Sequence, residues 1–185
     1  MFANKNTIAA FFVPVSLALA FAIAVLTQES FAQWTFARHA NILSWYVRPL
    51  LLLPLCYAAW KRSWAGVGWS IFAMITSMAW FPVPDTPRPE VIDFLEMEKA
   101  LLAQGWNLAN ILGLLAVVGY GALLIAAFWR QSWKLGLGVA AFGAVGKSLW
   151  SVAFSPESGT SVLPFAAAGF AILVTFVFLI RAMRR

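Results

Sequence analysis

Cysteine, histidine and charged residues are scarce in this chain. One cysteine in 185 residues excludes a disulfide scaffold and any cysteine-rich metal site. One histidine excludes multi-histidine metal centres and haem held by two histidines. Charged residues make up 11% of the sequence, against about 25% in an average soluble domain. The composition therefore excludes an ordinary soluble domain and a disordered chain.

Hydrophobic residues, in contrast, account for 62% of the chain. A helix that crosses a bilayer needs roughly 20 mostly apolar residues. We expect an all-α integral membrane protein, a six-helix bundle with transmembrane helices at about 7–27, 42–60, 64–81, 106–129, 133–154 and 161–183. Helices are expected because backbone groups in lipid must be satisfied within each segment. Together they predict one polytopic membrane domain over residues 1–185.

The first apolar segment has two interpretations. It follows Lys5 and precedes Ser30-Phe31-Ala32, which resembles the small-x-small cleavage site of a signal peptide. However, its apolar run is longer than the 7–15 residues typical of a signal peptide's hydrophobic region. We expect a retained first transmembrane helix.

Most basic residues lie at the termini or in connections that contain no acidic residue. Under the positive-inside rule, the basic connections and both termini face the cytoplasm; these carry Lys5, Lys61, Arg62, Arg130, Lys134, Arg181, Arg184 and Arg185. All seven acidic residues fall in the opposite connections. We expect a bacterial-type inner membrane protein. Its net charge of +6 indicates contact with anionic membrane lipids and not nucleic-acid binding.

The connection between the third and fourth predicted spans carries a pattern of its own. Four prolines between Phe81 and Glu90 interrupt the helix. From about 90 to 103, apolar residues then fall on one helical stripe, consisting of Val91, Phe94, Leu95, Leu101 and Leu102. We expect a short amphipathic helix on the outer surface.

Small residues line the first predicted span. Ala18, Ala20, Ala22 and Ala24 give two pairs with small-xxx-small spacing, which lets helix backbones approach closely. One interpretation is packing within the bundle. The other is docking of the first helix to a partner membrane subunit.

Two predicted helical hairpins resemble each other. The segment Ala58–Trp64 resembles Ala126–Trp133 with one residue inserted. Both hairpins run from outside to inside and back, so a duplication would be parallel. Short turns between apolar helices also produce such likeness by chance, and both explanations stay open.

Polar residues inside apolar helices are the best indication of function, because burying them in a membrane is costly. Arg48 lies early in the second span and Lys147 lies in the fifth. We expect an outward-facing cationic pocket that binds an anionic small molecule or lipid headgroup, formed by Arg48, Lys147, Asn107, Asn110, Thr76, Ser44, Ser148 and Trp150. The alternative pairs Arg48 or Lys147 with Asp85 or Glu157, which would close the outer surface.

Catalytic patterns are weak. His39 lies in an outer connection, no carboxylate falls inside a span, and Cys56 fits a small core residue. We expect no enzyme activity, no catalytic residues, no metal site and no cofactor. In size and span number the chain resembles the six-helix substrate-binding components of vitamin uptake transporters, without sharing a residue motif. That resemblance implies a component that binds a solute from outside. From the residues themselves we expect a solute- or lipid-binding component, with a structural or assembly subunit of a larger complex as the alternative.

Overall fold

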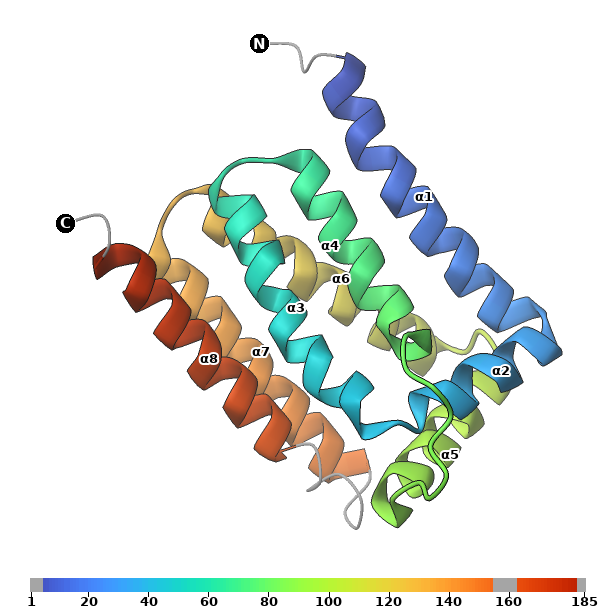
Figure 1. Cartoon of the computed structure of the whole chain (residues 1–185). Helices are drawn as coiled ribbons and strands as arrows, with labels where there is room; N and C mark the ends of the chain where they lie inside the picture. The colour runs from blue at the N-terminus through green and yellow to red at the C-terminus, as the bar shows by residue number, and fades with distance from the viewer. Residues whose placement is uncertain (1–4, 155–162, 183–185) are drawn as a thin grey trace. The chain divides into compact units, whose positions relative to one another are not determined.

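The computed structural model describes residues 5–154 and 163–182, and these contain helices and no strand. The helices are α1 (Lys5–Thr27), α2 (Glu29–His39), α3 (Ile42–Trp60), α4 (Trp64–Thr76), the 3-10 helix η1 (Ser77–Ala79), α5 (Pro89–Ala103), α6 (Leu108–Trp129), α7 (Trp133–Phe154) and α8 (Leu163–Ala182) (Figure 1). The prediction of an all-α protein is confirmed.

Three helices are long and apolar enough to cross a membrane. They are Ala9–Thr27 in α1, Ile42–Trp60 in α3 and Leu108–Trp129 in α6. The described residues also contain shorter apolar helices at Trp64–Ala79, Trp133–Gly146 and Ala167–Leu179. Length and composition thus support a membrane protein, while six spans and their orientation stay predictions.

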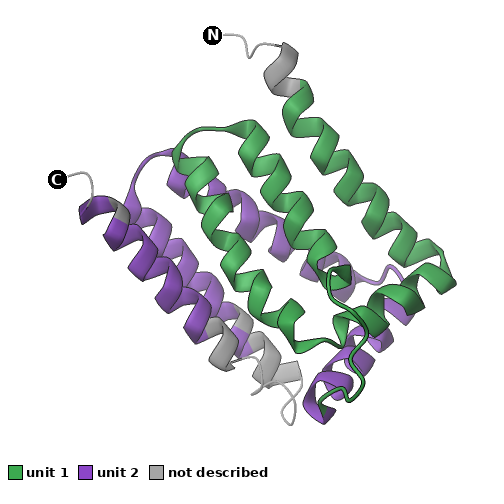
Figure 2. Ribbon diagram, viewed as in Figure 1, with its two compact units in different colours: residues 1–88 green, residues 89–185 purple. Residues whose placement is uncertain are grey.

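The chain divides into two compact units (Figure 2). Unit 1 comprises residues 1–88, with α1 to α4 and η1, and unit 2 comprises residues 89–185, with α5 to α8. The single membrane domain predicted from the sequence stays a prediction.

In unit 1, α4 packs between α1 and α3. The approach of α1 is close at Gly68, where a Cβ atom would lie 2.8 Å from the Phe11 carbonyl oxygen and 2.9 Å from Pro14 Cγ. Pro14 lies inside α1 and is buried. Glycine is therefore required at position 68 to admit the proline-bearing helix.

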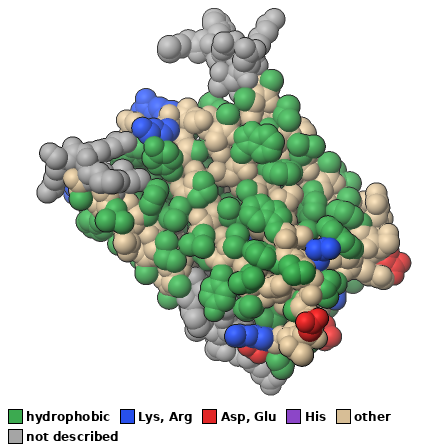
Figure 3. Space-filling view, in the orientation of Figure 1, with side chains coloured by type: hydrophobic (Ala, Val, Ile, Leu, Met, Phe, Trp, Pro, Cys, Tyr) green, Lys and Arg blue, Asp and Glu red, His purple; other side chains and the backbone are tan. Residues whose placement is uncertain are grey.

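The other side of α1 is apolar and exposed, through Phe12, Val13, Leu17, Leu19, Ile23 and Leu26. Figure 3 shows hydrophobic side chains over much of the visible face of α1 and α4. Of the predicted alanine stripe, Ala18 is buried and Ala20 is exposed. Burial of Ala18 fits packing within the protein, and docking of a partner through Ala20, Ala22 and Ala24 stays a prediction.

Helix α2 occupies a segment that the sequence pattern indicated as a connection. Glu29 lies in its first turn, and Arg38 and His39 lie in its last turn. This order of charges favours a helix because the helix dipole is positive at its start and negative at its end. The helix was missed because it is short and has no apolar run.

The third predicted span is shorter than expected. The sequence predicted a helix over 64–81, but α4 ends at Thr76 and only η1 follows, to Ala79. The hydroxyls of Thr76 and Ser77 donate to the carbonyls of Phe72 and Met74, at 2.9 and 2.8 Å. Bonds of this kind also occur inside continuing helices, at Ser70 and Ser148 for example. The helix ends because Pro82 disfavours the helical conformation just before it.

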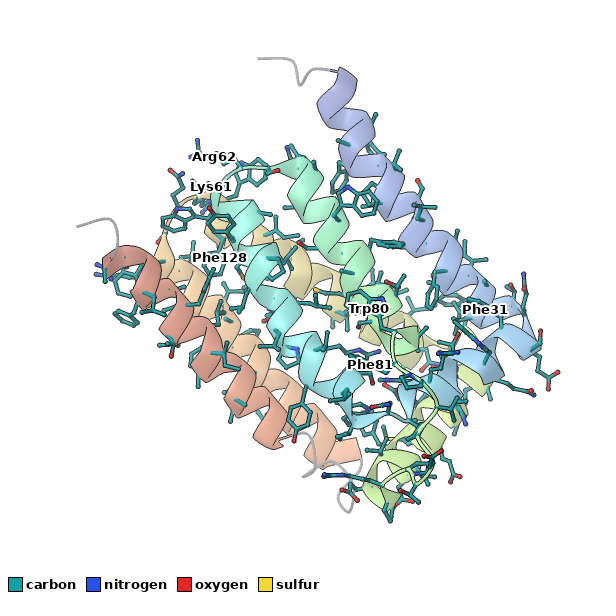
Figure 4. All side chains as sticks on the ribbon, in the orientation of Figure 1. Phe31, Lys61, Arg62, Trp80, Phe81 and Phe128 are labelled. Atoms are coloured by element: carbon teal, nitrogen blue, oxygen red, sulfur yellow. The ribbon has the colours of Figure 1, made fainter. Side chains whose placement is uncertain are left out.

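In unit 2, α7 packs against both α6 and α8. The ring of Phe128, labelled in Figure 4, lies against Gly136, where a Cβ would come within 2.7 Å of the ring. A Cβ at Gly143 would collide with the Tyr120 ring. The glycines of α7 thus make room for aromatic side chains of α6.

The predicted amphipathic helix is confirmed as α5. It begins at Pro89, and Val91, Phe94 and Leu95 are buried. Leu101 and Leu102 are exposed, and the placement of this helix on the outer membrane surface stays a prediction. The chain leaves this helix through Gly105, whose φ of +68° suits glycine.

The two hairpin turns match residue for residue, and the extra residue of the second segment, Phe128, lies just before its turn. The first reads Trp60-Lys61-Arg62-Ser63-Trp64 and the second Trp129-Arg130-Gln131-Ser132-Trp133. Arg62 and Gln131 adopt positive φ values of 54° and 56°. Ser63 and Ser132 each accept a hydrogen bond from the backbone N–H three residues later, at 3.2 and 3.3 Å. In both units, a residue with positive φ follows the end of the first helix, and a serine caps the start of the second.

Candidate functional site

Buried polar side chains gather in one part of unit 1. Those that the structure describes are Thr35, His39, Ser44, Ser70, Thr76 and Ser77. All but Ser70 lie on α2, at the start of α3 or where α4 passes into η1, and both α2 and α3 pack against η1. We call this region, with Arg38 and Arg48, the polar end of unit 1.

His39 and Ser44 connect α2 to α3. His39 Nδ1 lies 2.8 Å from Ser44 Oγ, and that oxygen lies 2.8 Å from the Asn41 carbonyl. The Trp45 indole N–H donates to the His39 carbonyl at 3.2 Å, and its ring packs 5.8 Å from the imidazole. Asn41 caps α3 by accepting from the Leu43 N–H at 3.0 Å. These bonds fix the corner between the two helices.

His39 is neutral at ordinary pH. Burial lowers the pKa of its imidazole from 6.5 to about 3, and the positive charge of Arg48 acts in the same direction. His39 is 1% exposed and Ser44 is 0% exposed. Although a serine beside a histidine resembles a nucleophile with its base, a substrate cannot approach a hydroxyl that is buried and bonded to backbone carbonyls. The pair is structural.

Thr76 also serves the local structure. Its hydroxyl donates to the Phe72 carbonyl and accepts the Trp80 indole N–H at 3.1 Å. Trp80 and Phe81 lie at the end of unit 1 opposite to Lys61 and Arg62, as Figure 4 shows. Thr76 was predicted as a pocket residue, and the structure gives its hydroxyl two protein partners.

Arg38 reaches from α2 to the segment after η1. One nitrogen, Nη1, donates to the Phe81 carbonyl at 3.2 Å, and the guanidinium lies 4.6 Å from the centre of the Trp34 ring. The Nε atom is buried and has no hydrogen-bond partner among the described residues. Nearby, Asn41 Nδ2 donates to the Pro82 carbonyl at 3.0 Å. Two side chains therefore attach this segment to the corner.

Thr35 lies one turn before Arg38 and is 0% exposed. Its hydroxyl has no hydrogen-bond partner among the described residues. The four other buried hydroxyls of the described chain each have a backbone carbonyl within hydrogen-bond distance. A buried hydroxyl without a partner costs free energy. Thr35 Oγ1 and Arg38 Nε therefore differ from the other buried polar atoms nearby, which have partners.

The predicted site residues of unit 2 have their own bonds. Asn107 caps α6 by accepting from the Asn110 N–H at 2.9 Å. Asn110 donates to the carbonyls of Leu101 and Gly105, both at 2.8 Å. Ser148 donates to the Ala144 carbonyl at 2.8 Å. The two asparagines thus close the turn between α5 and α6.

The predicted pocket combines residues of both units. Ser44, Arg48 and Thr76 belong to the polar end of unit 1, where Arg48 is half-buried in α3. The side chains of Lys147 and Trp150, and all of Glu157, are outside the described part of the structure. The pocket as a whole, and the alternative pairing with Asp85 or Glu157, stay predictions.

Thr35, Arg38 and His39 were not predicted as site residues from the sequence. Their i, i+3, i+4 spacing places them on one face of a helix, but this signal depends on recognising α2. Among the described residues no group of three His, Cys, Asp or Glu side chains could hold a metal ion. Comparison with protein-family models, curated proteins and solved structures gave no match to this chain.

Proposed function

We propose that this chain is a multi-pass membrane protein that binds an anionic small molecule or lipid headgroup, as a solute- or lipid-binding component of transport. In this proposal the three shorter apolar helices also cross the membrane, giving six spans with both termini in the cytoplasm. Positive residues in the hairpin turns and at the C-terminal end support that orientation. The polar end of unit 1 then faces outward.

The observation that carries the proposal is Arg48 within α3. This helix is apolar and long enough to span a membrane, and a half-buried arginine in its first half is expensive. The positive charge of Arg48 acts on His39, which is neutral. An anionic ligand would be attracted to Arg48, because guanidinium groups bind carboxylates and phosphates with paired hydrogen bonds.

A structural or assembly subunit is the second candidate, and a feature of α6 favours it. Gly113, Gly119 and Gly121 have no described atom within 4 Å of where a Cβ would lie. Exposed apolar side chains surround them, including Leu112, Val117 and Val118. A partner helix could approach this surface closely. The two proposals differ in what should co-purify with the chain.

Native mass spectrometry of the gently extracted full chain tests the proposal. The variants are Arg48→Ala and Lys147→Ala, with Arg62→Ala as a control, since this change removes a cation from the opposite end of unit 1. We expect a bound small molecule or lipid that is lost in the first two variants and kept in the control. Co-purifying protein chains without any such ligand would contradict the proposal and favour the subunit function.

A further inference from the structure

The guanidinium of Arg38 presents a binding edge that the described residues leave unused. Phe81 O binds Nη1, which leaves the edge formed by Nε and Nη2, the side of arginine that takes two oxygens of a carboxylate or phosphate at once. Nε is buried without a partner among the described residues. The nearest acid on the same helix, Glu29, accepts instead from Gln33 Nε2 at 3.2 Å. The Arg38 charge is therefore not neutralised by α2.

A second donor lies on the same face of α2. Thr35 precedes Arg38 by three residues, so their side chains are neighbours on the helix. In α1, α4, α7 and α8, Thr27, Ser70, Thr76, Ser148 and Thr175 each donate to the carbonyl four residues earlier. The Thr35 hydroxyl has no such bond although it is fully buried. Among the described residues, the Thr35 hydroxyl is a donor without an acceptor. It is a neighbour of Arg38, whose positive charge has no described anion beside it.

Aromatic rings hold this edge in place. The guanidinium rests on Trp34, and the Trp34 ring stacks on Phe31, with centroids 5.5 Å apart. Phe31 in turn packs against Phe21 of α1, at 5.4 Å. Trp34 is 45% exposed, and α2 lies in the sequence between two helices that could span a membrane. Partly exposed tryptophan beside arginine is typical of residues at the level of lipid headgroups.

We propose that Arg38 and Thr35 form a phosphate-binding subsite on α2, which takes the phosphate group of a membrane lipid. Two phosphate oxygens accept from the Nε–Nη2 edge, and one also accepts from the Thr35 hydroxyl. Arg38 is half-buried and Thr35 is fully buried, so a ligand meets Arg38 before it reaches the hydroxyl. This inference rests on the proposed function, because it names the ligand class and part of the site.

The test is binding of defined probes to the full chain in detergent, measured by native mass spectrometry and calorimetry. The probes are phosphatidylglycerol, a diacylglycerol with the same acyl chains, and inorganic phosphate. The variants are Arg38→Lys, which keeps the charge but loses the two-donor edge, and Thr35→Val, which loses only the hydroxyl. Arg62→Gln is the control.

We expect phosphatidylglycerol to bind and diacylglycerol not to bind. Arg38→Lys should weaken binding about tenfold and Thr35→Val roughly fivefold, as expected for lost bonds to a charged and a neutral donor. Thr35→Val should not lower the thermal stability of the lipid-free protein, because it removes a buried hydroxyl without a partner. Inorganic phosphate binding with the same dependence on both variants, without lipid binding, would support the subsite and assign it to free phosphate.

Equal lipid binding by wild type, Arg38→Lys and Thr35→Val would overturn the subsite, as would equal weakening by Arg62→Gln. If a ligand dependent on Arg48 persists in that case, only the subsite fails. If no anionic ligand depends on Arg38, Arg48 or Lys147, the proposed function fails as well. Thr35→Val keeps the test decisive should Arg38→Lys fail to fold.

Discussion

Units 1 and 2 each contain a hairpin with the same kind of turn, but the side chains that they bury differ in polarity. Both hairpins turn through a serine cap and a residue with positive φ between two tryptophans. In unit 1 the described interior includes threonine, serine and histidine, whereas in unit 2 the described buried residues are all apolar or glycine. The shared turn therefore determines how a hairpin closes, and the segments outside it determine which unit contains a polar end.

The difference begins with the helix that precedes each hairpin. Helix α2 buries Thr35, Phe36 and His39, whereas α5 buries Val91, Phe94 and Leu95. Both are short helices ahead of a long apolar one. A connecting helix, α2, therefore contributes buried polar side chains to unit 1. Substitutions in both units test this contrast.

Replacing glycines at helix contacts by alanine should change the stability of the protein differently in the two units. Gly68→Ala should destabilise the protein by about 1–3 kcal/mol, because the added methyl meets backbone atoms of α1. Gly143→Ala should cost less, since the Tyr120 ring can rotate away. Gly138→Ala, where no described atom lies within 4 Å of the Cβ position, should be neutral or stabilise by up to about 1 kcal/mol. SDS-induced unfolding in micelles measures all three, and equal losses would contradict the packing.

Acid should weaken the polar end of unit 1 through His39. The pKa of His39 is about 3 in the folded protein, against its ordinary value of 6.5, so between these values the unfolded chain binds the proton and the folded chain does not. Stability is therefore retained above pH 6.5 and lost as the pH falls, by up to about 1.4 kcal/mol per pH unit, or about 2 kcal/mol at pH 5.

His39→Gln isolates this effect, because other titrating groups are common to both proteins. The free energy of unfolding of the wild type should fall more steeply than that of the variant between pH 6.5 and 4. Parallel curves would mean that His39 becomes charged without cost in the folded protein.

The serine caps should be equivalent in the two units. Ser63→Ala and Ser132→Ala each remove a side-chain acceptor from a helix start and should each cost about 1 kcal/mol. Unfolding of the two single variants and of the double variant gives the comparison. A loss confined to one unit would show that the two turns are alike in geometry but not in energy.

Substitutions at the two residues with positive φ should change the stability of the protein least. Arg62→Gly and Gln131→Gly relieve the left-handed conformation and should stabilise each turn by at most about 1 kcal/mol. Thermal unfolding in detergent detects a shift of this size. Destabilisation by Arg62→Gly alone would reveal that the side chain's own contacts outweigh the backbone strain.

Much of the fold is predictable from residue patterns. The predicted second and fifth spans have the same bounds as α3 and α7, since tryptophans and polar turns mark their ends. The prediction extended the third span too far because it continued the helix to Phe81. Pro82 disfavours the helical conformation in the residue before it, and the carbonyls of Phe81 and Pro82 accept from Arg38 and Asn41 instead. The likeness of the two hairpin turns is visible in the sequence, but the positive φ that Arg62 and Gln131 share is known only from the structure.

The candidate site was less predictable. Arg48 and Ser44 were selected because polar groups in an apolar helix are visible in sequence. Asn107 and Asn110 were selected for the same reason, but their amides cap and close a turn. Arg38 and Thr35 were not selected, because a missing hydrogen bond is a property of three-dimensional neighbours.

The sequence by itself determined an all-helical chain with apolar helices long enough for a membrane, because helix length and composition are local properties. It also determined the polar turns that separate these helices. The tertiary structure alone decided that His39 is buried against Ser44, and that Thr35 and Arg38 Nε are buried without partners among the described residues. Burial and hydrogen bonding depend on which segments pack together, and no single segment encodes them.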